Sequence, residues 1–93
     1  MIIENNDYIL EQLPDNSTFW DLTFPKVINK GKDNERVEFK DPIYGVTLDN
    51  AKKRIALFRV NKKLGNNKKI SPEKFNVLYT EEKAIINKEL ISL

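Results

Sequence analysis

The sequence of 93 residues contains neither histidine nor cysteine, and these two absences remove much of the usual chemistry of enzymes. Without histidine, no side chain has an ordinary pKa near neutral pH. Without cysteine, there is no thiolate nucleophile and no zinc site of the N/S type. None of the few serines lies in a G-x-S-x-G or S-x-x-K motif. We therefore expect no catalytic residue, cofactor or metal; an enzyme that depends on Glu or Lys is the alternative.

The sequence also lacks a long hydrophobic run. No apolar stretch approaches the roughly 20 residues that cross a membrane, and the start, "MIIENNDYIL", is acidic where an export signal would be basic. At 40% hydrophobic residues and a net charge of +2, the composition is typical of a small folded domain. We expect a cytoplasmic protein without membrane contact.

The first residues predict a β-hairpin. The segment "DYILEQL" (7–13) is followed by the turn cluster "PDNS" and then by "TFWDLTF" (18–24). In an extended chain, Trp20, Leu22 and Phe24 fall on one face, because side chains alternate between the two faces of a strand. This face is predicted to be buried.

A third strand is predicted at "ERVEFK" (35–40), with Val37 and Phe39 inward. "DPIYG" then reads as a turn, with Tyr44 covering the core. The sequence thus predicts a three-stranded antiparallel β-meander over residues 7–46.

Helical signals begin at Thr47. A helix over 47–64 is predicted, with Thr47 or Asp49 as its N-cap and Gly65 at its end. Its segment "RIALFRV" is also acceptable as a strand. The apolar stripe expected to pack on the sheet comprises Leu48, Ala51, Ile55 and Phe58.

A C-terminal helix is predicted over 71–92, where Ser71 is the cap and Pro72 lies in the first turn. "EEK" after Thr80 allows a second helix to restart there. The predicted apolar line comprises Phe75, Tyr79, Ile86, Leu90 and Leu93. The whole is expected to be one α+β domain, residues 1–93, in which the first helix packs on the sheet.

Charge is unevenly distributed along the chain. Residues 50–72 contain eight Lys or Arg and no acid. Such a segment either contacts a polyanion or is the solvated side of an ordinary helix. The candidate contact residues are Lys52, Arg59, Lys63, Lys68 and Lys69.

Residues 1–25 show the opposite pattern, with five acids and no base. These carboxylates either imitate phosphates in the basic groove of a partner or solvate an edge strand and oppose aggregation. The alternative acidic surface comprises Asp7, Glu11, Asp15 and Asp21.

The run from Phe19 to Val60 resembles small uncharacterised proteins of phages and prophages in low-GC bacteria. The shared pattern is an early Trp strand, a G-K loop, a strand like "RVEFK", and "YG-x-TL" opening a basic helix. The resemblance implies a non-enzymatic interaction protein of a mobile element. Its partner would be a host protein or ribonucleoprotein complex, and it would inhibit host defence or nucleic-acid handling by occlusion, as anti-CRISPR proteins do.

The predicted β-β-β-α order is also similar to small DNA-binding domains of phage integrases and plant transcription factors. Those domains keep their strands basic, whereas Asp21, Glu35 and Glu38 lie on predicted strands here. A small DNA- or RNA-binding protein that uses the basic helix and the following loop is therefore the alternative function. Leftover apolar positions allow a homodimer: Leu57, Leu64, Ile85 and Ile91.

Overall fold

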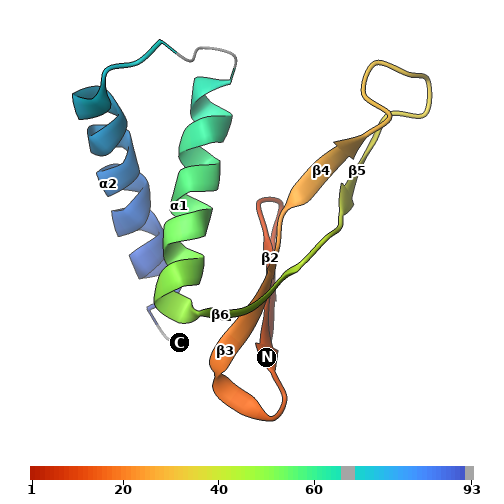
Figure 1. Ribbon diagram of the computed structural model, residues 1–93, viewed down its shortest axis with the longest axis vertical. Helices are drawn as coiled ribbons and strands as arrows, with labels where there is room; N and C mark the ends of the chain where they lie inside the picture. The colour runs from red at the N-terminus through yellow and green to blue at the C-terminus, as the bar shows by residue number, and fades with distance from the viewer. Residues whose placement is uncertain (66–68, 92–93) are drawn as a thin grey trace. The chain divides into compact units, whose positions relative to one another are not determined.

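The computed structural model describes residues 1–65 and 69–91, with the backbone alone at positions 16 and 17. The chain divides into two compact units, which we call the sheet unit (Met1–Ala51) and the helical unit (Lys52–Leu93). Figure 1 labels most of the elements, which are β1 (Ile2–Glu4), β2 (Ile9–Leu13), β3 (Asn16–Thr23), β4 (Pro25–Ile28), β5 (Arg36–Phe39), β6 (Ile43–Thr47), α1 (Leu48–Leu64) and α2 (Pro72–Glu89). The predicted α+β class is confirmed.

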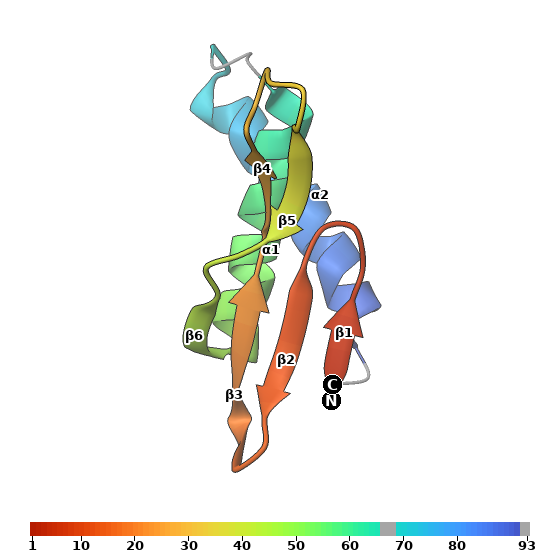
Figure 2. The same cartoon turned by 90° about the vertical axis from the view of Figure 1, so that its right-hand side faces the viewer.

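The sheet unit contains a four-stranded antiparallel sheet in the order β1-β2-β3-β6 (Figure 2). The predicted hairpin of β2 and β3 is present, with Leu10 opposite Leu22 and Gln12 opposite Trp20. Leu10 and Leu22 are fully buried, and Trp20 is 3% exposed. The predicted alternation in this hairpin is therefore confirmed for Trp20 and Leu22. A further strand, β1, adds to the edge of β2.

The predicted third strand is wrong in its pairing. Residues 36–39 form β5, which pairs with β4 in a separate two-stranded hairpin and not with β3. The partner of β3 is β6, which occupies the segment predicted to be a turn. Pro25 is the reason, because it cannot donate a ladder hydrogen bond and so separates β3 from β4. The returning chain is divided in the same way into β5 and β6.

Two turn-forming residues bend the returning chain. Asp41 (φ 58°), between β5 and β6, and Gly45 (φ 66°), within β6, both have positive φ, and the register shifts between Trp20 and Leu22. The extra β6 residue forms a bulge, and Gly45 fits there because it has no Cβ. The Gly45 N–H donates a hydrogen bond of 3.1 Å to Asp21 Oδ1. The turn-forming residues of "DPIYG" therefore bend the returning chain and do not end it in a turn.

This bend changes the environment of three predicted core residues. Val37 is 63% exposed and Phe39 37%, because β5 pairs beyond the end of the four-stranded sheet. Tyr44, next to the bulge, is 73% exposed. The prediction that these side chains build or cover the core is wrong. Val46 contributes instead, and it lies opposite Trp20.

The first predicted helix is present as α1, and no strand forms at "RIALFRV". Thr47 is its cap, because Thr47 Oγ1 accepts a hydrogen bond of 3.2 Å from the Asn50 N–H. Gly65 ends it with φ 56°, the left-handed conformation expected after a helix. Of the predicted stripe, Ala51 and Ile55 are fully buried. Both boundary signals of this helix are confirmed.

The second helix, α2, is continuous through Thr80. The Lys74 N–H donates a hydrogen bond of 3.2 Å to Ser71 Oγ, which confirms Ser71 as the cap. Ile86 and Leu90 are buried as predicted, whereas Leu93 lies outside the described residues. Searched over the described part of the chain, neither helix has the length and apolarity that a membrane crossing requires.

Candidate interaction surfaces

Two of the predicted polyanion contacts form ion pairs with α2 inside the helical unit. Arg59 Nη1 and Nη2 donate to Glu89 Oε2 and Oε1, over 2.8 and 3.3 Å, so the pair is bidentate. Lys63 Nζ pairs with Glu82 Oε1. The later residue of α1, Lys63, pairs with the earlier residue of α2, Glu82, so the two helices are antiparallel. The carboxylates of Glu82 and Glu89 therefore neutralise part of the positive charge of α1.

Glu82 is the unusual member of these pairs, because its carboxylate is buried. The residue is 3% exposed and lies on the side of α2 that also buries Ile86. Burial of an unpaired carboxylate is strongly unfavourable, and Lys63 supplies the opposite charge while its own side chain stays 54% exposed. Lys63 therefore has a structural role in joining the helices.

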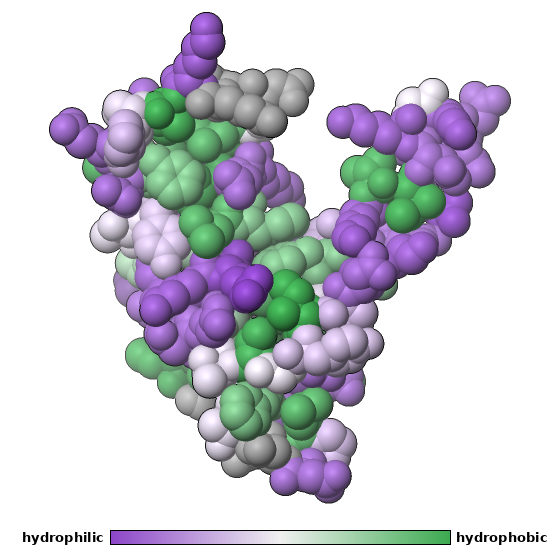
Figure 3. Space-filling model, viewed as in Figure 1, coloured by the Kyte–Doolittle hydropathy of each residue, from purple (hydrophilic) through white to green (hydrophobic). Residues whose placement is uncertain are grey.

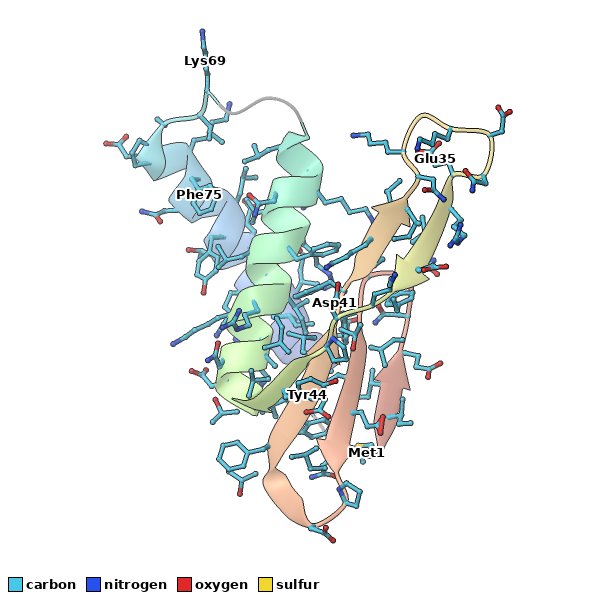
Figure 4. All side chains as sticks on the ribbon, turned by 45° about the vertical axis from the view of Figure 1, so that its right-hand side comes forward. Met1, Glu35, Asp41, Tyr44, Lys69 and Phe75 are labelled. Carbon is cyan, nitrogen blue, oxygen red and sulfur yellow. The ribbon has the colours of Figure 1, made fainter. Side chains whose placement is uncertain are left out.

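Of the remaining predicted polyanion contacts, the structure describes Lys52 and Lys69, which lie near opposite ends of α1. Lys52 is half-buried, and Lys69 is exposed beyond the end of α1 (Figure 4). At 1.5 Å per residue, about 18 Å of helix separates Lys52 from Leu64. Lys68 lies outside the described residues. Polyanion binding by these side chains stays a prediction.

The pairing of the strands brings part of the predicted acidic surface together. Glu11 lies directly opposite Asp21, and Ile2 lies opposite Glu11 on the other side. Asp7 precedes β2, whereas Asp15 lies in the turn between β2 and β3. Directly opposed residues and every second residue of a strand share a face. A common surface therefore forms, which we call the acidic sheet face: Ile2, Glu4, Ile9, Glu11, Phe19, Asp21, Thr23 and Thr47.

A third surface, on the β4–β5 hairpin, was not predicted. Pro25 lies opposite Phe39, and Val27 lies opposite Val37. These four residues share one side of the hairpin, which we call the hairpin face. Val27, Val37 and Phe39 are 51%, 63% and 37% exposed. The hairpin extends from the four-stranded sheet, and Figure 3 shows hydrophobic side chains on it surrounded by hydrophilic ones.

The opposite side of this hairpin carries charged pairs. Arg36 Nε donates a hydrogen bond of 2.5 Å to Glu38 Oε1, which holds the pKa of Glu38 below its ordinary value of 4.5. Lys26 Nζ donates over 2.5 Å to Asp41 Oδ2 and holds the pKa of Asp41 below its ordinary value of 3.8. The hairpin therefore has one apolar side, and its opposite side carries these charged pairs together with Ile28.

These pKa shifts predict acid sensitivity of the hairpin. A carboxylate with a lowered folded-state pKa stabilises the fold above its unfolded pKa, and this stabilisation is lost as pH falls through the folded value. We expect the protection of the β4 and β5 amides against hydrogen exchange, taken relative to the intrinsic exchange rate at each pH, to fall below about pH 4.5, the ordinary value for Glu38, when followed by NMR. In Glu38→Gln/Asp41→Asn, this pH dependence should be absent. Equal pH dependence in the variant would contradict the role of the two pairs.

The sequence contains a signal for Glu82 but not for the hairpin face. An acid in the middle of the apolar line between Tyr79 and Ile86 requires a basic partner across the helix interface. The alternation of Val37 and Phe39 correctly indicates one apolar side, but it does not indicate which strand pairs with β5. In the described residues, no three acidic side chains converge closely enough to hold a metal ion.

The comparisons with known proteins give no family for this chain. No family model matches it, and neither a curated protein nor a solved structure matches it.

Proposed function

We propose that this chain is a non-enzymatic interaction protein that binds another protein through the hairpin face and acts by occluding its partner. The observation that carries the proposal is the exposure of Val27, Val37 and Phe39 on a hairpin of only two strands. A two-stranded hairpin is marginally stable by itself. A partner that covers this side would stabilise the hairpin and remove its apolar surface from water.

The size and surroundings of the hairpin face suit the centre of an interface. Full burial of a fully exposed Val or Phe side chain contributes about 1.5–3 kcal/mol. Because these three side chains are already partly covered, each would contribute roughly half of that, which together is enough for a small hot spot. Specific interfaces surround such an apolar centre with polar side chains. The charged side chains of the same hairpin lie on its opposite side and directly after β5, from where they can reach the edge of an interface: Lys26, Arg36, Glu38, Lys40 and Asp41.

The identity of the partner is proposed from the resemblance to phage and prophage proteins. It points to a host defence complex or another nucleic-acid-handling complex, which this chain would inhibit in the cytoplasm. Occlusion needs no reactive group, which agrees with a sequence that lacks histidine and cysteine.

Direct DNA or RNA binding is the second candidate. It is favoured by the absence of acids from residues 50–72 and by the exposed side chain of Lys69. The ion pairs of Arg59 and Lys63 with α2 weigh against it, because phosphates would compete with two carboxylates that are already in place. A gel shift at low salt, with duplex DNA and with RNA, is the test that separates the two candidates.

The proposed function predicts that one exposed substitution prevents partner binding. We expect Val37→Lys to remove the stoichiometric partner that the wild-type chain retains from a lysate, because an interface centre does not accommodate an unpaired lysine. The matched control is Val77→Lys on α2, where the valine is 56% exposed. It adds the same charge and should leave capture unchanged. Equal capture by both variants would overturn the proposal for the hairpin face.

A further inference from the structure

We infer that the acidic sheet face is a docking surface for a positively charged, Lys- or Arg-rich surface of a protein. This inference deepens the proposed function, on which it rests, because it names the chemistry of the partner. It uses a different face from the hairpin face, on strands β1, β2 and β3.

The first support is that the acidic residues of this face destabilise the sheet. Glu11 lies directly opposite Asp21, and like charges in this position destabilise a strand pair. Glu4 is on the same face, two residues from Ile2, which lies opposite Glu11. A lysine in place of Glu11 or Asp21 would turn this repulsion into an attraction. A cationic partner would compensate this repulsion.

The second support is charge complementarity. The four strands of the sheet contain no Lys or Arg, and every basic residue of the chain follows position 25. A nucleic acid would be repelled by this face, whereas a basic protein surface would be attracted to it and steered toward it.

The third support is the apolar component of the same face. Ile2 is 54% exposed and Phe19 is 36% exposed, so the carboxylates lie beside hydrophobic side chains. Asp21 is oriented by the hydrogen bond that it accepts from the Gly45 N–H, so its position is set before any partner binds. Hydrophobic side chains beside charged ones are the composition of a protein interface.

An NMR titration of the isotope-labelled chain tests this inference. The probe is a synthetic nonapeptide of lysines and two leucines, and the reference is the same peptide with glutamate in place of lysine. We expect amide shifts confined to β1, β2 and β3 with the lysine peptide, and none with the glutamate peptide. Glu4→Gln/Glu11→Gln should weaken binding about fivefold, as expected for two partly exposed charge pairs.

The control variant is Glu73→Gln/Glu81→Gln, which removes the same charge from exposed positions on α2. It should change the affinity less than twofold. Equal weakening by both variants, shifts spread over α2, or no binding at millimolar peptide would overturn the inference. The proposed function fails separately: Val37→Lys and Val77→Lys would then capture the partner equally, whatever the peptide does.

Discussion

Lys63→Met is expected to lower the free energy of unfolding by about 2–3 kcal/mol, because it leaves the Glu82 carboxylate buried without its partner. Removal of one member of a fully buried pair costs about 3–5 kcal/mol. The exposed position of the Lys63 side chain reduces that figure, because water reaches the pair. Urea denaturation followed by circular dichroism at the helical wavelength measures the change.

The matched control is Lys74→Met, which removes a charge from an exposed position on α2. Its effect should stay within about 0.5 kcal/mol. The double variant Lys63→Met/Glu82→Leu should recover most of the lost stability, because two apolar side chains can replace a buried pair with little cost. If Lys63→Met and Lys74→Met were equally stable, the structural role of Lys63 would be refuted.

This result would also decide how the basic segment is understood. A lysine that is required for folding is unsuitable as a polyanion contact, because phosphate binding would withdraw it from Glu82. The count of charges along residues 50–72 gives no information on the acids of α2, which approach only after the helices pair. Arg59 illustrates the same effect, since Glu89 lies 30 positions later in the sequence.

The helices could be predicted closely because their signals are local. Thr47, Gly65 and Ser71 act within one turn of the chain, through hydrogen bonds or a backbone conformation that each residue type favours. The buried alternation of Trp20 and Leu22 is local in the same sense. These features depend little on the rest of the fold.

Strand pairing could not be predicted in the same way, because it depends on residues far apart in the sequence. The alternation in "RVEF" (36–39) fits either of two partners, β3 or β4. The bend at Asp41 and the bulge at Gly45 decide between them, and both residue types are equally typical of a turn. The hairpin face is a consequence of this pairing, so the sequence alone did not indicate it.

The carboxylates of the sheet could be predicted from the sequence only in part. Their excess is evident from composition, since residues 1–25 contain no base. Only the register shows that Glu11 and Asp21 are directly opposed. Asp21 also has a structural role, because it accepts a hydrogen bond at the Gly45 bulge. The composition of residues 1–25 does not indicate this role.

The central claim is that the protein works by contact and that the hairpin face makes this contact. Site-specific photo-crosslinking tests it most directly, with a photoreactive phenylalanine analogue placed at Val37 or, as the reference, at the similarly exposed Val77. Irradiation in a cell lysate should give one adduct of defined mass from position 37 and none from position 77. Adducts from both positions alike, or from position 77 alone, would contradict the claim.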